Sequence, residues 1–596
     1  MPRGGPAAEV VAEMVAAGRA AAARPAFAPG ADIPMSARTR GEAAVGDLVR
    51  MLVQGRQARI LEVYGPARAP GAVMAALLAD EGRGHGFRRE VEAEVAAIAD
   101  DDPLADPGRR DLRDQDVVTI DPQGAKDHDD AIAARHEGDD VRLWVHIADV
   151  SHYVPAGGAI DREAARRGTS VYVPGTVEPM LPARLSADLC SLRPGVDRRA
   201  VTAEMRVDPA GELHDVRFHR SVIRSEGRLT YPEVDAHLGG APLPGGAGLA
   251  ATVAAAREAS RRLRERRRRR GALEVDGGEP VWSLAPDRVE GVHREHQTPS
   301  HALVEDCMIA ANEAVARFLI ARRAPTLFRF HEDPAQVRVE RLHAQLEALD
   351  VAAPPLREGP LAPSERREAA RAAGEAVTRH LAAARARGEP ARGAALWGLV
   401  LRALAQAHYT ADAVGHSGLA SAAYTHFTSP IRRYPDLLVH RALLDALGLG
   451  PPGPDAAELS VAGPSSSESE REAAAIERRA DRICAALLLE QELRGDPDAA
   501  VVAEVTGLVP GGAFVAWGEV FEGFLPARRM TDAELVLDPL EVALADGTGR
   551  RVLRLGDPVA VRVTDVEPLR GRVTVEPADG PRRPRLRRPA AGRRRA

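Results

Sequence analysis

The feature that most constrains this chain is a run of four aspartates between two apolar segments, in DPQGAKDHDDAI (121–132). Asp121 follows VVTI, and Asp127, Asp129 and Asp130 lead into AIAA. Short apolar runs separated by turn formers predict buried strands, so these carboxylates should lie at partly buried strand ends. Carboxylates this close repel one another unless a cation neutralises them. Because their oxygens are natural ligands of Mg²⁺ and Mn²⁺, the cluster indicates a divalent-metal site rather than an exposed acidic turn.

A single lysine, Lys126, stands inside this cluster, and the other 79 basic residues are arginine. Asparagine is equally rare, with Asn312 alone. An ammonium is a compact charge, whereas a guanidinium is a wide planar fork. Survival of lysine here favours a site that cannot hold a guanidinium, and we predict a catalytic role for Lys126. Chance survival is the alternative. For His128, in the same cluster, we favour a supporting role over metal ligation.

A basic segment, TSPIRRYPDLLVHR (428–441), is the counterpart of the acidic cluster. Pro430 suits the first turn of a helix, so Arg432 and Arg433 should lie near a helix N-terminus that favours an anion. Arginine forks pair bidentately with phosphate. A solvated helix start is the alternative for this segment alone. A metal site and a phosphate clamp on one chain together indicate two-metal phosphodiester hydrolysis.

The composition is that of a globular chain, and its 596 residues are too many for one domain. The net charge of −6 does not by itself require a nucleic-acid partner. Three distant cysteines argue against a disulfide framework and favour a reducing compartment. The sequence lacks an apolar run of about 18 residues and the features of a signal peptide. We therefore expect a cytoplasmic protein without a membrane partner.

Local patterns predict several further segments. The Ala-rich start of the chain predicts a helix, and a Pro/Ser/Gly run at 451–470 predicts a linker. Arginines without acidic residues predict a disordered basic tail at the C-terminus. Glycine-punctuated apolar runs predict strands of two small barrels, the first from runs at 45–53, 58–65 and 71–79 and the second within 499–577.

Six ordered motifs carry a resemblance to a known family: TIDPQGAKDHDDAIAAR, HIADVSHYV, RGTSVYVPGTVEPMLPARLSADLCSLRPG, LVEDCMIAANEAVARFL, FRFHEDP and YTHFTSPIRRYPDLLVHR. Together they closely resemble the RNB catalytic domain of the ribonuclease II / ribonuclease R family, over about residues 112–495. VVAEVTGLVPGGAFVAWGEVFEGFLP resembles an S1-type OB domain, and 40–95 more weakly resembles a cold-shock domain.

The resemblance implies a multidomain α+β fold. Its RNB catalytic domain would be a mixed sheet with surrounding helices, flanked by small OB-fold β-barrels. The expected divisions are an N-terminal helical segment (1–38), a cold-shock-like OB barrel (39–100), the RNB catalytic domain (101–496), an S1-type OB RNA-binding domain (497–578) and a basic disordered tail (579–596).

The resemblance also implies roles for individual residues. The four aspartates match metal-site positions that hold Mg²⁺, with Mn²⁺ as a possible substitute, and Asp129 matches the one most critical for turnover. Tyr172 matches a tyrosine that stacks on the 3′-terminal base, Arg432 an arginine on the scissile phosphate, and Glu477 a glutamate near the 3′ end. In the S1-type barrel, Phe514, Trp517 and Phe521 are candidate RNA-stacking residues or, alternatively, barrel core.

We therefore expect a hydrolytic, processive 3′-to-5′ exoribonuclease that degrades single-stranded RNA to nucleoside 5′-monophosphates and acts as a monomer. A catalytically silent RNA-binding regulator on the same fold is the first alternative. A binding-only protein has no need to keep four repelling carboxylates, which argues against it. A hydrolase acting on DNA is the second alternative, because metal-aspartate chemistry does not itself read the 2′-hydroxyl.

Overall fold

The computed structural model describes residues 8–17, 20–36, 40–54, 57–273, 278–388 and 393–579. Its largest unit is a six-stranded mixed sheet in the order β12-β9-β8-β7-β13-β6. β12 also pairs with β13, so that five of these strands close into a ring. The strands are β6 (Arg110–Asp111), β7 (Val117–Asp121), β8 (Asp130–Glu137), β9 (Asp140–Ala148), β12 (Asp197–Val207) and β13 (Leu213–Thr230).

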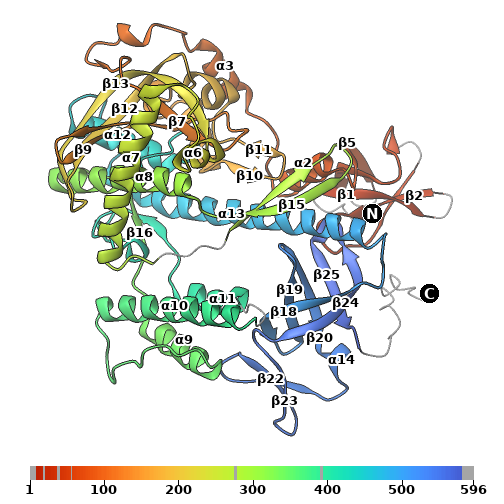
Figure 1. Cartoon of the computed structure of the whole chain (residues 1–596). Coiled ribbons are helices and arrows are strands. Elements are labelled where there is room, and N and C mark those ends of the chain that lie inside the picture. Colours follow the sequence, from red (N-terminus) through yellow and green to blue (C-terminus); the bar gives the residue numbers. More distant parts are fainter. Residues whose placement is uncertain are drawn as a thin grey trace.

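Helices cover this sheet and share its core (Figure 1). Val118, Ile147 and Phe218 from the strands pack with Cys307 and Phe427 in one buried cluster. The covering helices are α6 (Tyr231–Leu238), α7 (Ala247–Arg269), α8 (Pro299–Arg322) and α12 (Tyr434–Ala446). The expected mixed sheet with surrounding helices is confirmed.

Several short elements accompany this unit. They include α4 (Val150–Tyr153), α5 (Ala159–Arg167), β10 (Val171–Val173), β11 (Thr176–Glu178), β16 (Phe328–Phe330) and β17 (His408–Thr410). A separate helical layer follows in the chain and contacts the C-terminal barrel through α11. Its members are α9 (Gln336–Ala348), α10 (Pro363–Ala386) and α11 (Gly393–Ala403).

The N-terminal region is a five-stranded antiparallel sheet in the order β3-β2-β1-β4-β5. The helix expected at its start is wrong, because residues from Ala8 onward form strands. Val11, Ala12 and Met14 are buried by pairing with both neighbouring strands, and this tertiary packing overrides the helix propensity of alanine. The strands are β1 (Ala8–Ala17), β2 (Ala20–Pro25), β3 (Ile33–Met35), β4 (Asp47–Gln54) and β5 (Gln57–Pro66).

The strand expected at 71–79 is also wrong. Residues Pro70–Asp80 form helix α2, which buries Val73 and Leu77 against the sheet. Proline at the first helical position and the good helix formers that follow explain this outcome. The small β unit therefore begins before residue 39, and its strands end at Pro66. Helix α3 (Arg89–Ala97) follows α2 in the chain.

Helix α13 (Ala456–Glu492) has 37 residues and runs beside the main sheet unit, the N-terminal sheet and the C-terminal barrel (Figure 1). The linker expected at 451–470 is wrong, because most of it is the first part of this helix. Asp455 caps it by accepting the Glu458 N–H. Gly463 lies against the Tyr409 carbonyl, and Ser467 accepts the Tyr409 N–H. Small residues here permit close packing and do not mark exposed chain.

The C-terminal region contains a closed barrel in the order β18-β19-β20-β25-β24, as expected, with a smaller three-stranded sheet beside it. The basic tail after residue 579 lies outside the described residues. The barrel strands are β18 (Ala500–Val509), β19 (Gly512–Trp517), β20 (Phe521–Pro526), β24 (Pro558–Glu567) and β25 (Arg572–Pro577). The smaller elements are α14 (Ala527–Met530), β21 (Leu535–Leu537), β22 (Ala543–Asp546) and β23 (Arg551–Arg554).

A shared apolar cluster joins both β units to α13. Phe27, Val73 and Leu487 are buried in it, and Phe521 of the barrel packs against it. A hairpin of β14 (Glu279–Leu284) and β15 (Val289–Glu295) crosses the junction, where Arg294 donates from its backbone N–H and Nε to Glu519. The three cysteines are buried and free. Within the described ranges, no helix is long and apolar enough to cross a membrane.

Gly571 lets the barrel approach α13 closely, since an added Cβ would lie 2.7 Å from the Arg482 Cβ. Gly549 also has a positive φ but faces open space. We expect Gly571→Ala to lower the free energy of unfolding by about 1–3 kcal/mol more than Gly549→Ala, because overpacking adds to the backbone strain. Chemical denaturation of both variants measures the difference. Equal losses would mean that the barrel is not held against α13 at this point.

Candidate active site

The acidic loop, residues 121–130, connects β7 to β8 in the middle of the sheet. Asp121 is the last residue of β7, paired with Thr230 of β13, and Asp130 is the first residue of β8, paired with Ile147 of β9. The strands therefore hold the outer two aspartates at the sheet end. His128 is buried, and its Nδ1 hydrogen-bonds Oδ2 of Asp121 at 2.7 Å. This contact agrees with the supporting role expected for His128.

Asp129 joins the acidic loop to the basic segment across about 300 residues of sequence. Its side chain is 4% exposed, and Oδ1 accepts the Ile431 backbone N–H at 2.8 Å. Oδ2 is buried without a hydrogen-bond partner and lies 3.6 Å from Nε of Arg432. The two motifs singled out in the sequence thus meet at one carboxylate.

The two arginines of the basic segment have different environments. Arg433 forms a bidentate ion pair with Asp436, whose Oδ1 also accepts the Ser429 N–H. That ion pair shapes the loop, so Arg433 is committed to a structural contact. The Arg432 side chain is 47% exposed beside Asp129 and is the one available to a phosphate. Helix α12 begins at Tyr434, so both arginines precede the helix and Pro430 does not start it, contrary to expectation.

Tyr172 connects a third segment to the acidic loop. Its hydroxyl donates to Oδ2 of Asp127 at 2.8 Å, and its backbone N–H donates to Oε1 of Glu477 on α13 at 2.9 Å. Thr169 and Ser170, shortly before Tyr172, are bound to the basic segment, because the Ser170 N–H and the Thr169 hydroxyl both donate to the Arg432 carbonyl. Tyr172 is 37% exposed, so part of its ring is open to solvent next to the aspartates.

Burial and mutual repulsion disfavour the charged forms of two aspartates. Burial raises the pKa of Asp129 well above its usual range, an effect that the charge of Arg432 opposes. Burial, with the Asp121 charge second, raises the pKa of Asp130 to about 7. Burial likewise raises the pKa of Glu477, partly offset by the hydrogen bond from Tyr172. The loop thus holds more negative charge than its surroundings neutralise.

The donor set of the loop fits an oxygen-preferring divalent cation. Among the described residues, no three acidic, histidine or cysteine side chains stand close enough together to form a ready cage. Asp121 is engaged by His128 and Asp127 by Tyr172. The orphaned Oδ2 of Asp129 and the raised pKa values of Asp129 and Asp130 nevertheless mark carboxylates that need a positive partner.

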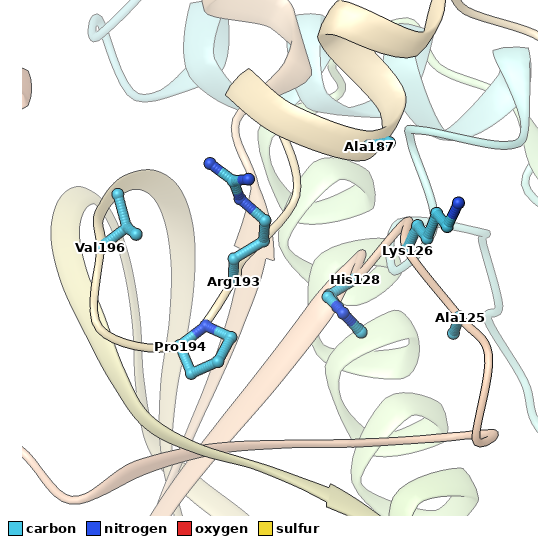
Figure 2. A pocket seen from close by; sticks show the side chains of 7 residues that line it. All are labelled: Ala125, Lys126, His128, Ala187, Arg193, Pro194 and Val196. Carbon is cyan, nitrogen blue, oxygen red and sulfur yellow. The ribbon is translucent and has the colours of Figure 1, made fainter.

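Lys126 does not provide that charge in this structure. Its side chain is exposed and lines a pocket together with His128 of the loop and Arg193 of a facing segment (Figure 2). Within the described part of the chain, its ammonium makes no ion pair with any of the four aspartates. The cation beside Asp129 is Arg432. The catalytic role expected for Lys126 stays a prediction.

The three barrel aromatics have different exposures. Phe514 is 49% exposed on β19 and tilts against Phe524, as a stacking residue would. Trp517 is 8% exposed and belongs to the barrel core, the alternative considered for it, and its expected RNA contact stays a prediction. Phe521 packs against α13 and the apolar junction described above, which leaves its ring half-buried. Of the three, Phe514 is the one open to an RNA strand.

Sequence reasoning missed Tyr231. It begins α6 and stacks on His301 with ring centroids 3.8 Å apart. Burial raises the pKa of Tyr231, and the charges of Asp130 and Asp121 raise it further, which places its hydroxyl in the field of the acidic loop. The helix start could have been found from its capping box, Thr230 with Glu233. No spacing in the sequence links Tyr231 to the aspartates.

The family model described as RNB domain matches residues 109–448, which is more than half of the chain. The chain belongs to the RNB family. A second model, S1 RNA binding domain, matches residues 496–576 at the C-terminal barrel of this RNB protein. The resemblance to the ribonuclease II / ribonuclease R family, with an S1-type C-terminal domain, is thereby confirmed.

Several relatives of this RNB chain are called ribonuclease R. That of Vibrio parahaemolyticus serotype O3:K6 is 33% identical over 540 residues, covering 86% of this chain and 61% of the relative. The ribonuclease R of Aquifex aeolicus is 34% identical over 535 residues, covering 87% of this chain and 72% of the relative. The solved structure of Mycoplasma genitalium RNase R in complex with ribose methylated single-stranded RNA superposes with a TM-score of 0.82 at 22% identity, covering 96% of this chain and 89% of that one. The chain spans about three fifths of the length of the first curated relatives.

We expect Mg²⁺ to raise the melting temperature of the metal-free protein, because a bound cation relieves the repulsion among the aspartates. Mg²⁺ at a hundred times its Kd would add about 2.7 kcal/mol to the free energy of unfolding. Since the pKa of Asp130 is raised to about 7, protons compete below that pH, and the shift should be smaller at acidic than at alkaline pH.

The matched variants for this measurement are Asp129→Asn and Asp139→Asn. Asp139 is an exposed aspartate at the β8–β9 turn of the same sheet. Differential scanning fluorimetry with and without Mg²⁺ should show a reduced shift for Asp129→Asn and a wild-type shift for Asp139→Asn. Identical shifts in all three proteins would contradict a cation site at Asp129.

Proposed function

We propose that this chain is a hydrolytic exoribonuclease that degrades single-stranded RNA processively from its 3′ end and releases nucleoside 5′-monophosphates. The observation that carries the proposal is the meeting of Asp129 with Ile431 and Arg432, which joins four carboxylates to an exposed guanidinium. Names and RNA-bound structures among the relatives support the substrate class.

Asp121, Asp127, Asp129 and Asp130 would hold Mg²⁺ or Mn²⁺. Nucleases of this family are hydrolytic and metal-dependent in general, and the bound ions would supply a nucleophilic water and charge stabilisation for in-line phosphodiester cleavage. His128 orients Asp121 through its 2.7 Å hydrogen bond. The Ile431 N–H fixes the Asp129 carboxylate and leaves Oδ2 directed away from the backbone contact.

The residues around the aspartates would position the 3′ end of the strand. Arg432, exposed beside Asp129, pairs with the scissile phosphate as a planar fork. The Tyr172 ring stacks on the terminal base, while its hydroxyl is held by Asp127 and its backbone by Glu477. Glu477 therefore acts as a positioning residue for Tyr172. Arg433 contributes by shaping the loop through Asp436.

The C-terminal barrel would hold the strand before it reaches the aspartates. The S1 family match and the exposed Phe514 support base stacking there. We further propose that the protein acts as a cytoplasmic monomer on single-stranded RNA. The silent-regulator alternative is weaker, because a binding protein gains nothing from a buried Asp129 carboxylate oxygen without a partner.

We expect Asp129→Asn to reduce RNA hydrolysis by several orders of magnitude while RNA binding stays close to wild type, because phosphate and stacking contacts supply most of the affinity. The measurement is degradation of 5′-labelled single-stranded RNA with Mg²⁺, paired with a filter-binding assay. Asp139→Asn is the matched control and should keep wild-type activity. A wild-type protein that binds RNA without degrading it would instead favour the silent regulator, and cleavage of single-stranded DNA at an equal rate would favour the DNA alternative.

Two substitutions separate the ring of Tyr172 from its hydroxyl. We expect Tyr172→Ala to stop degradation earlier and leave longer end products, because a lost stacking contact costs about 1–3 kcal/mol on the last nucleotides. Tyr172→Phe keeps the ring and loses only the hydrogen bond to Asp127, so its end products should match those of wild type. Product lengths on a sequencing gel decide this. Long products from both variants would assign the effect to the hydroxyl and not to stacking.

A further inference from the structure

A pocket of about 510 Å³ opens on the acidic loop, and the proposed chemistry does not use it. Figure 2 shows Lys126 and His128 projecting from the loop and Arg193 from the facing segment that follows the short helix Leu185–Leu189. Ala187, Pro194 and Val196 complete the facing wall. None of Asp127, Tyr172 or Arg432 lines this pocket.

The two walls are fixed relative to each other by Ser191. Its hydroxyl donates to the Lys126 carbonyl at 2.7 Å and accepts the His128 N–H at 3.1 Å. The Leu192 N–H in turn donates to the His128 carbonyl. These bonds tie the segment before Arg193 to the loop that carries Lys126. The backbone of the two walls is therefore fixed by the fold, and the exposed side chains of Lys126 and Arg193 project from it.

The pocket lining holds two cationic side chains, Lys126 and Arg193, and no acidic side chain. Arg193 donates to Oδ1 of Asp188 at 2.5 Å, and Arg198, which does not line the pocket, donates to the same oxygen at 3.1 Å. Two guanidinium groups therefore share one carboxylate oxygen. Nε of Arg193 is buried without a hydrogen-bond partner. Within the described residues, the Lys126 ammonium has no ion-pair partner. A compact ammonium and a guanidinium whose side chain is 43% exposed suit a phosphate monoester, which is close to a dianion at neutral pH.

We propose that this pocket binds the 5′-phosphate of a released nucleoside 5′-monophosphate. This inference rests on the proposed function, because that reaction produces such a phosphate monoester beside the acidic loop. Asp127 faces Tyr172, whereas its chain neighbour Lys126 lines the pocket, so the phosphate can be held away from the ring that grips the RNA. The one aromatic ring in the pocket lining, that of His128, is buried and hydrogen-bonded to Asp121, so recognition is by phosphate and not by base identity.

Because Lys126 is the only lysine of the chain, its rate of acetylation reports whether the pocket is occupied. Acetylation by an N-hydroxysuccinimide ester modifies Lys126 and the chain's N-terminal amine, which peptide mass spectrometry distinguishes. The reaction is run in EDTA without RNA, so it does not require turnover. We expect adenosine 5′-monophosphate to slow Lys126 acetylation in a saturable way and inorganic phosphate to do so more weakly. Adenosine should have no effect. Equal rates with and without adenosine 5′-monophosphate would overturn the proposal.

Variants then assign the protection to this pocket. Arg193→Ala should raise the half-protecting nucleotide concentration about tenfold or more, because it removes the bidentate donor. Arg217→Ala, an exposed arginine on β13, and Tyr172→Ala should leave it unchanged. Loss of protection in Tyr172→Ala but not in Arg193→Ala would place the nucleotide in the RNA-end site and refute the assignment.

An RNA degradation assay on the same preparation separates the two claims. Intact hydrolysis without nucleotide protection would remove the pocket assignment alone. Protection in a protein that degrades no RNA would overturn the pocket's role as a product site together with the proposed function. Hydrolysis with Arg193-dependent protection supports both.

Discussion

The hydrogen bond from the Ile431 backbone to Asp129 is the contact on which the proposed site depends. It fixes one oxygen of a buried carboxylate and leaves the other without a partner beside Arg432. A buried carboxylate in this state is costly unless a cation or a proton joins it. The same contact holds the basic segment, 302 residues further along the chain, against the acidic loop. Charge that is unfavourable for folding is thereby held beside the guanidinium that we propose pairs with the scissile phosphate.

Helix α13 connects the region of the aspartates to the N-terminal sheet and the C-terminal barrel. Glu477 on the helix accepts the Tyr172 N–H, and one turn further Asp481 accepts the Trp282 indole N–H from the crossing hairpin. Leu487 then packs in the apolar junction that both β units share. A rise of about 1.5 Å per residue lets one helix place these contacts along a single line. The residue that would stack on the RNA end and the barrel that would deliver the RNA are therefore positioned by the same element.

Where chemistry was concentrated in a short segment, sequence reasoning selected residues that the structure brings together, and their roles stay predictions. The four aspartates and Arg432 could be identified from residue types and spacing, and the family resemblance supplied Tyr172 and Glu477. It failed where tertiary packing decided the outcome. Alanines in β1 are strand residues because two neighbouring strands bury them, and the Gly/Ser run of α13 is helical because it packs on Tyr409. Arg433, Trp517 and Tyr231 could not be assigned, because their partners lie elsewhere in the sequence or only in space.

We propose that water attacks the last phosphodiester of an RNA strand at this site. Digestion of single-stranded RNA in water enriched in heavy oxygen, followed by mass spectrometry of the products, tests it most directly. The released mononucleotides should carry one heavy oxygen atom in the 5′-phosphate. The 3′-oxygen of the shortened strand should be unlabelled. Cyclic phosphates, 3′-phosphates or unlabelled mononucleotides would contradict it.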